Sequence, residues 1–289
     1  MRQLLFLVTL AYPVLAQQAS TPGNADWSKP FPPLRVVGNL YYVGTYDLAS
    51  YLITTPQGHI LINTGLSDSV PIILANVEAL GFKFSDIKIL LATHGHFDHA
   101  AGLAEIKRLT GAKMMVEEGD VSVLESGGKT DFRWGKDLNA RFEPVKVDRA
   151  LKDGEQVTWA GTTLTVHHHP GHSKGASSFS LNVAEAGKTY RVLIANMGSI
   201  NPGVRVSGMP QYPQITDDYA RTFHDQKELK IDIWLASHAS QFHLHDKYKP
   251  GDAYDPNRFV DPQGYLRSVE ELEKVYRDQL ARERAEGKK

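Results

Sequence analysis

The stretch His94-Gly95-His96-Phe97-Asp98-His99 places four metal-ligand side chains within six residues. It follows Ile87-Lys88-Ile89-Leu90-Leu91-Ala92, an apolar run introduced by the turn-forming Ser85-Asp86, and such a run predicts a buried strand. The ligands would then lie at the carboxyl end of a strand, where open α/β sheets place their sites. A polar loop that faces water would explain one or two of these residues but not four, and a buried Asp98 without a metal would be an unpaired charge.

Two later segments also run from a strand into histidine. The first is His167-His168-His169-Pro170-Gly171-His172, and the second is Ile231–Ala236 followed by Ser237-His238. Alternate residues of a strand point to opposite faces, so the histidines of the first segment cannot all bind one ion. We predict His172, which follows the Pro-Gly turn, as the ligand there, and His238 as the ligand in the second segment. The other three histidines, His167, His168 and His169, are assigned to packing or to hydrogen bonds around the ligands.

The composition limits the classes of function. With 42% hydrophobic and 22% charged residues, the 289-residue chain is typical of a globular protein with a substantial core. Its formal net charge of −1 provides no general attraction for nucleic acid or for an anionic membrane. The absence of cysteine excludes disulfides, thiolate zinc ligands and a cysteine nucleophile.

The N-terminus is typical of a secretory signal. Met1-Arg2-Gln3 supplies a positive charge, residues 4–15 are mostly apolar, and Val14-Leu15-Ala16 predicts cleavage between Ala16 and Gln17. The apolar run is shorter than the ~20 residues that span a bilayer. We therefore expect a periplasmic or secreted bacterial protein whose mature part, residues 17–289, is one monomeric catalytic domain without membrane insertion.

The apolar pattern predicts strands and helices in two similar halves. The predicted strands are 40–43, 51–54, 59–63, 87–92, 114–116, 157–159, 163–168, 177–183, 190–195 and 231–236, and the predicted helices are 67–80, 101–109, 120–124, 215–223 and 264–282. This alternation favours an α/β fold in which two sheets pack together with helices outside.

The order His-x-His-x-Asp-His, then Pro-Gly-His, then a late strand-ending histidine resembles the metallo-β-lactamase superfamily. The resemblance implies a four-layer αβ/βα sandwich with two zinc ions at its edge. It also implies that one zinc is held by His94, His96 and His172, and the other by Asp98, His99 and His238.

An absence narrows the resemblance. Most hydrolases of the superfamily place a metal-bridging aspartate at the end of the strand that follows Pro-Gly-His, but residues 191–203 contain neither a carboxylate nor a cysteine. The third subclass, B3, has serine there, and Ser199-Ile200-Asn201-Pro202-Gly203 is similar to its pattern. The chain resembles the GOB-type branch of this subclass, which often has glutamine at the first ligand position; here that residue is His94, so both sites are expected to be complete.

The same resemblance implies substrate contacts. Ser199 and Asn201 would bind the substrate carboxylate or a zinc-bound water. Phe132 and Trp134 stand on the glycine-rich loop 127–135, from which they could cover the site.

Zinc lowers the pKa of a bound water to about 7 and so produces hydroxide near neutral pH. The net charge of two zinc ions, one hydroxide and the Asp98 carboxylate is about +2, which favours an anionic substrate and an anionic leaving group. Asp98 can also orient the hydroxide. A bicyclic β-lactam meets both demands. The sequence thus predicts a zinc β-lactamase that hydrolyses the amide bond of penicillins, cephalosporins and carbapenems and confers antibiotic resistance.

Three alternatives stay open at this point. A zinc-dependent lactonase or thioesterase of the same superfamily would act on neutral esters. A di-iron oxidoreductase of the same fold would have glutamate where His96 stands, and an all-imidazole site suits zinc better. A zinc-storage protein would bind metal without turning over any substrate.

Overall fold

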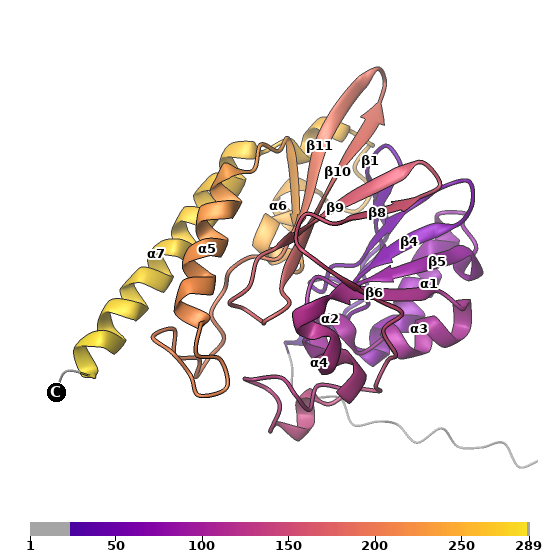
Figure 1. Ribbon diagram of the computed structural model, residues 1–289. Helices are drawn as coiled ribbons and strands as arrows, with labels where there is room; N and C mark the ends of the chain where they lie inside the picture. The colour runs from indigo at the N-terminus through magenta and orange to yellow at the C-terminus, as the bar shows by residue number, and fades with distance from the viewer. Residues whose placement is uncertain (1–23, 288–289) are drawn as a thin grey trace, which may run out of the picture.

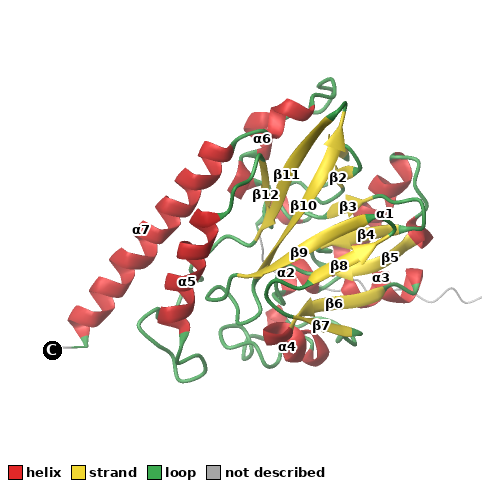
Figure 2. Cartoon of the chain, turned by 45° about the horizontal axis from the view of Figure 1, so that its top comes forward, coloured by secondary structure: helices red, strands yellow, loops and turns green. Residues whose placement is uncertain are grey.

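The computed structural model describes residues 24–287 of the chain, so the predicted signal segment, Met1 to Ala16, lies outside the described residues. Two β-sheets pack face to face, and helices cover the outer side of each sheet (Figures 1 and 2). The predicted four-layer α/β sandwich is therefore confirmed.

The first sheet contains seven strands in sequence order. They are β1 (Leu34–Val37), β2 (Leu40–Tyr42), β3 (Tyr51–Ile53), β4 (His59–Ile62), β5 (Ile87–Leu91), β6 (Lys113–Glu117) and β7 (Arg149–Leu151). Pairing is antiparallel from β1 to β4 and parallel from β4 to β7. The helices of this half are α1 (Val70–Ala79), α2 (Phe97–Ala100), α3 (Leu103–Thr110) and α4 (Val121–Ser126).

The second sheet has the order β12 (Ile233–Ala236), β11 (Lys188–Ala195), β10 (Ser177–Glu185), β9 (Thr162–His168) and β8 (Gln156–Trp159). Only the β11–β12 pair of this sheet is parallel. The helices of this half are α5 (Ile215–Glu228), α6 (Leu244–Lys247) and α7 (Pro262–Glu286). Helices α5 and α7 run side by side along one flank of the molecule (Figure 1).

Burial on both faces explains why the central strands are continuous apolar runs. On β5, Ile89 and Leu91 join the core between the two sheets, whereas Leu90 points to the opposite face and packs with residues of α1 and α3. A strand covered on both sides has no solvent face, so it shows no polar alternation. β5 is accordingly apolar and buried except at Lys88, which lies near the start of the strand and is partly exposed.

The short edge strands β1 and β7 were not predicted. On β7, Arg149 and Ala150 are exposed and only Leu151 is buried, so the strand has no apolar run to reveal it. The terminal helix α7 begins at Pro262, earlier than the predicted Gly264. The Asp261 side chain accepts a hydrogen bond from Gly264 N at 2.9 Å, and proline fits the first turn because its missing N–H is not needed there.

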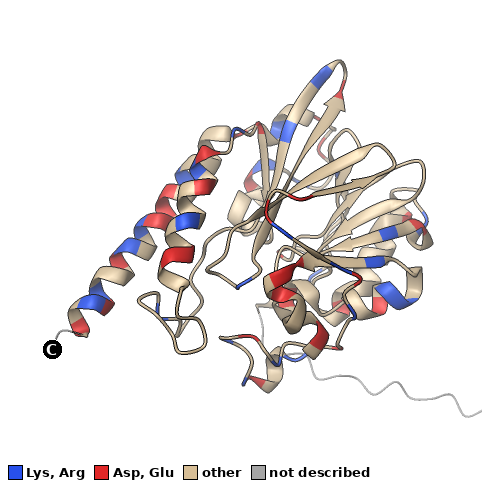
Figure 3. Ribbon diagram, viewed as in Figure 1, with Lys and Arg blue, Asp and Glu red and all other residues tan. Residues whose placement is uncertain are grey.

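Basic and acidic residues are interspersed along α7 (Figure 3), which indicates a solvated outer face. Between residues 24 and 287, no helix combines the length and the apolar character that crossing a membrane requires.

The strand directions bring the predicted ligand segments to one edge of the sandwich. His94 follows β5 and His238 follows β12, and both strands belong to parallel pairs. Within each sheet, parallel strands end at a common edge. The 3.2 Å distance between His99 Nε2 and His238 Nε2 shows that the loops at these edges of the two sheets meet.

Candidate metal centre

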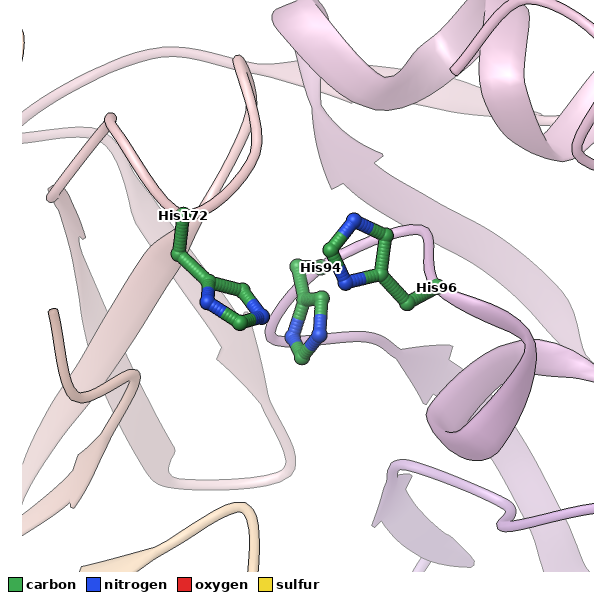
Figure 4. Close-up of side chains that lie close together, drawn as sticks. All are labelled: His94, His96 and His172. Atoms are coloured by element: carbon green, nitrogen blue, oxygen red, sulfur yellow. The ribbon is translucent and has the colours of Figure 1, made fainter. Parts of the chain in front are cut away.

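Three imidazoles from two loops meet at this edge. His94 and His96 come from the loop after β5, and His172 comes from the loop between β9 and β10 (Figure 4). Each of the three offers a ring nitrogen, and these nitrogens lie within 4.8 Å of one another. The structure therefore brings the first predicted ligand group together.

The second group lies beside the first. Asp98 and His99 are on the short helix α2, and Asp98 Oδ2 lies 3.2 Å from His99 Nε2 and 3.5 Å from His238 Nε2. The two Nε2 atoms of His99 and His238 are 3.2 Å apart. A tetrahedral ion with bonds of about 2.0 Å requires ligand atoms about 3.3 Å apart. The spacing of these three side chains matches that requirement.

The donor set fits a metal. His94 Nε2 is buried and has no hydrogen-bond partner among the described residues. Burial lowers the pKa of His94 well below its usual range and that of His172 to about 3, so both rings are neutral and offer lone pairs. Such lone pairs would be costly to bury unless an ion satisfied them. Nitrogen and carboxylate ligands in this arrangement indicate that the chain binds a metal.

The second group carries charge in the metal-free protein. Burial by itself disfavours the charged forms, but His99 and His238 hold the pKa of Asp98 well below its usual range. The carboxylates of Asp47 and Asp98 likewise overcome burial at His238 and raise its pKa to about 9. Metal binding at His238 would therefore release a proton.

One ring nitrogen of several predicted ligands is fixed by a partner from a distant segment. His172 Nδ1 donates to Ser199 O at 2.8 Å, and His238 Nδ1 lies 3.1 Å from Asp47 Oδ2. Further contacts join His94 Nδ1 to the Asn196 amide at 2.8 Å and His96 Nε2 to Asp131 Oδ2 at 3.4 Å. These partners set the orientation of the rings. The sequence analysis predicted none of them in this role, and it named Ser199 only as a contact to the substrate or a zinc-bound water.

Trp27 is another missed residue. It ends a short 3₁₀ helix, Ala25–Trp27, and its Nε1 donates to Asp47 Oδ2 at 3.2 Å. Its ring lies 5.7 Å from that of His238 and 6.3 Å from that of Phe97. The sequence around Trp27 is polar and shows no periodic pattern, so the contact of this tryptophan with Asp47 and His238 could not be predicted from it.

The segment after β11 differs in detail from the expectation. The strand ends at Ala195, and Met197 borders a small cavity together with His94 and His172. Ser199, expected at the place of the bridging aspartate, has its Oγ 3.3 Å from His172 Nδ1, so its direct contact is with a ligand. The Nδ2 of Asn201 is buried and has no hydrogen-bond partner in the described part of the chain.

Loop 127–141 approaches this segment. Trp134 lies 6.5 Å from the ring of His96, whereas Phe132 packs edge-on against Tyr212 at 4.9 Å. Arg133 stacks on Trp134 at 4.1 Å, and its Nε donates to Pro202 O at 2.5 Å. The loop is thereby tied to the segment that contains Ser199 and Asn201.

His167, His168 and His169 form hydrogen bonds with neighbouring residues and do not join the predicted ligand groups. His167 Nε2 and His169 Nδ1 each lie 2.7 Å from a serine Oγ, of Ser180 and Ser178 respectively, and His168 Nε2 donates to Lys174 O at 2.8 Å.

Comparisons with known proteins agree with this geometry. A family model described as the metallo-beta-lactamase superfamily matches residues 45–185. The crystal structure of the metallo-beta-lactamase GOB-18 from Elizabethkingia meningoseptica is 49% identical, with a TM-score of 0.88 over 92% of this chain and 99% of that one. The chain belongs to the metallo-β-lactamase superfamily.

Within the superfamily, the chain groups with subclass B3. The class B3 di-zinc metallo-beta-lactamase LRA-12 from an Alaskan soil metagenome is 50% identical, with a TM-score of 0.87 over 90% of this chain and 98% of that one. A curated relative, the hydroxyacylglutathione hydrolase of Hyphomonas neptunium, is 29% identical over 48% of this chain. That match covers only 45% of the relative's own length.

Proposed function

We propose that this protein is a zinc-dependent β-lactamase that hydrolyses the amide bond of penicillins, cephalosporins and carbapenems. One observation carries the proposal. Residues 196–214, which connect β11 to α5 and border both ligand groups, contain no carboxylate and no cysteine. The centre therefore has less negative charge than one with a bridging aspartate, and it favours an anionic substrate. The near full-length similarity to subclass B3 enzymes supports the same reading.

Two zinc ions per chain would be held by the six predicted ligands, one by the three histidines His94, His96 and His172, and one by Asp98, His99 and His238. When bound, the ions would supply a water of lowered pKa and an electrophile for the lactam carbonyl. The six predicted ligands are five neutral imidazoles and one carboxylate, so they would leave the positive charge of the ions largely uncompensated.

Asp98 is the group of the chain that we assign to the chemical step. His99 and His238 hold its carboxylate ionised, so it can accept a hydrogen bond from the attacking water and keep that water oriented. As the water oxygen bonds to the lactam carbonyl carbon, the bond between that carbon and the lactam nitrogen breaks, and the nitrogen takes up the proton that the water loses. The reaction requires no covalent intermediate with the protein.

We place the substrate between loop 127–141 and the segment after β11. Trp134 would pack against the substrate near His96, and Phe132 would support this wall through Tyr212. Ser199 and Asn201 would bind the carboxylate of the substrate, for which the Asn201 side chain would have to turn, since its Nδ2 is buried among the described residues. Ser199 Oγ also lies 3.3 Å from His172 Nδ1, so Ser199 would contact both the substrate and a predicted ligand.

A lactonase or thioesterase of the same superfamily is the alternative. It agrees with the hydroxyacylglutathione hydrolase match, but that similarity covers less than half of either chain. The missing bridging carboxylate also argues against it.

The test is hydrolysis of a penicillin, a chromogenic cephalosporin and a carbapenem by the purified protein, beside an acyl-homoserine lactone and an acyl thioester. Turnover of the lactams that a chelator abolishes and added zinc restores supports the proposal. Turnover of the lactone or thioester alone, by a protein loaded with zinc, would overturn it in favour of the alternative. Metal analysis of the same sample gives the number of zinc ions and distinguishes zinc from iron.

We also propose export to the periplasm or the medium with cleavage after Ala16, and a monomeric mature enzyme. N-terminal sequencing of the exported protein and its sedimentation behaviour test these two points.

A further inference from the structure

A carboxylate outside the ligand set joins the two loops that supply the three-histidine group. Asp120 follows β6, ends the 3₁₀ turn Glu118–Asp120 and is fully buried. Its Oδ2 accepts hydrogen bonds from Gly95 N and from Ser173 Oγ, both at 2.7 Å, and its Oδ1 accepts one from Gly175 N at 2.9 Å.

The donors belong to the two ligand loops. Gly95 lies between His94 and His96, and Ser173 follows His172 directly. The two loops come from different halves of the molecule. The Asp120 carboxylate accepts from a backbone N–H of the first loop, and from a side-chain hydroxyl and a backbone N–H of the second. We propose that Asp120 is a positioning residue that sets the distance between these loops and thereby the geometry of the three-histidine metal site.

Glycines let the loops approach this carboxylate. A Cβ on Gly175 would lie 2.4 Å from Asp120 N and 2.8 Å from its Cγ, and a Cβ on Gly119 would lie 2.7 Å from Lys174 O. Real Cβ atoms do not come so close to backbone atoms. The turn after β6 and the loop after His172 are thus packed backbone against backbone, and a larger residue at either position would separate them.

The cost of burial argues that this carboxylate is kept for its contacts. Desolvation raises the pKa of Asp120, which means that the surroundings disfavour its charged form. A buried carboxylate is unfavourable for the fold unless hydrogen bonds compensate it, and an apolar residue would avoid that cost. An apolar side chain at this position could not form hydrogen bonds to both loops, and hydrogen bonds fix the distance and direction between the groups they join.

The chain offers a matched control. Glu283 on α7 is also a buried carboxylate with three hydrogen-bond donors, namely Val206 N, Ser207 N and Gln279 Nε2. None of these residues is next to a predicted ligand. Glu283→Gln therefore reproduces the loss of a buried carboxylate without touching the ligand loops.

The experiment compares Asp120→Asn with Glu283→Gln in the full-length chain. Zinc affinity is measured by competition with a chromophoric chelator, and the stability of the metal-free protein by its melting temperature. We expect both variants to have a lower melting temperature than the wild type. Only Asp120→Asn should bind zinc about 10- to 100-fold more weakly at one of its sites. The visible spectrum of the cobalt-substituted protein should change in Asp120→Asn and not in Glu283→Gln.

Equal zinc affinity in Asp120→Asn and the wild type, with a melting temperature lowered as in Glu283→Gln, would make Asp120 a merely structural residue and overturn the inference. If Asp120→Asn does not fold, Ser173→Ala removes one of the three bonds and retains the carboxylate. It should weaken zinc binding several-fold, and unchanged affinity would again refute the proposal.

The inference rests on the metal site of the proposed function but not on its substrate. A wild-type protein that binds no zinc would remove both, whereas zinc binding without lactam hydrolysis would leave the inference intact.

Discussion

His169→Asn should make the folded protein less sensitive to acid, by an amount that the structure allows us to calculate. His169 is buried beneath α5, and its Nδ1 lies 2.7 Å from Ser178 Oγ and 3.4 Å from Gln226 Nε2. Ser178 Oγ accepts a hydrogen bond from Asn196 N, so its own proton is available for Nδ1. In this arrangement the ring is a neutral acceptor with no room for a second proton.

Burial, together with the nearby His167, His168 and Arg221, lowers the pKa of His169 to about 3. The unfolded chain has a histidine pKa of about 6.5. Below pH 6.5 the unfolded state therefore binds a proton that the folded state does not, and the free energy of unfolding falls as the pH falls towards 3. At pH 5 this difference amounts to about 2 kcal/mol. The amount is the same for any folded-state pKa below about 4, because the folded ring is neutral at pH 5 in every such case.

The assay is urea denaturation of wild type and His169→Asn at pH 8 and pH 5, with a chelator present so that metal loss does not contribute. Asparagine keeps a hydrogen-bonding group near Ser178 but cannot be protonated. The variant loses stability at pH 8 because the smaller side chain packs less well, and subtracting this loss isolates the protonation effect. Between pH 8 and pH 5 the variant should lose about 2 kcal/mol less than the wild type. Equal losses would refute the reasoning, since they would mean that His169 titrates alike in both states.

Three further changes test the site itself. Asp98→Asn should lower turnover by about 10²-fold or more with an unchanged circular dichroism spectrum, and near-normal turnover would remove Asp98 from the chemical step. His172→Ala should abolish zinc binding at the three-histidine group, measured as metal stoichiometry, and an unchanged stoichiometry would assign that ligand elsewhere. Arg133→Ala removes the bond to Pro202 O and should raise KM for β-lactams about tenfold while kcat changes little; an unaltered KM would show that this contact does not order the substrate wall.

That the three segments with the predicted ligands meet at one site could be anticipated from the sequence, because each combines a local pattern with a known chemistry. His94 to His99 are dense in sequence and follow an apolar run that can only be a strand or a buried helix segment. His238 follows such a run as well, and His172 follows the strand Thr162–His168, in which the buried Leu164 and Val166 alternate with partly exposed residues. The fold class followed from the same runs and from the resemblance of the motif order, and both signals lie within short windows of sequence.

The partners of the ligands could not be predicted, because their contacts span long separations. Asp47 reaches His238 across 191 residues of sequence, and Asp120 reaches Ser173 across 53. Single aspartates in polar segments show no periodicity, and many of them simply face water. The sequence offered a signal at one of these places only in hindsight: Gly119 and Gly175 permit the close backbone approach around Asp120.

The expected role of Ser199 depended on counting residues from the end of a strand, and such boundaries are the least reliable part of a sequence prediction. β11 ends at Ala195, so Asn196 and Met197 are the first residues of the connection, and Asn196 already contacts His94. A shift of one or two residues exchanges the side chains that face the site. The absence of any carboxylate from the whole connection does not depend on this count, and for that reason it supports the proposed function better than Ser199 does.

The structure also bears on how the centre binds metal. Several ligand rings have one nitrogen fixed by a partner, such as His238 by Asp47 and His172 by Ser199 O. Asp98 Oδ2, His99 Nε2 and His238 Nε2 lie 3.2–3.5 Å apart, which is the spacing that a tetrahedral ion requires. Partners that hold the rings at this spacing reduce the ordering that metal binding would otherwise have to supply. It follows that changes in the partners should weaken metal affinity first, and that excess zinc should restore activity to a partner variant but not to a ligand variant.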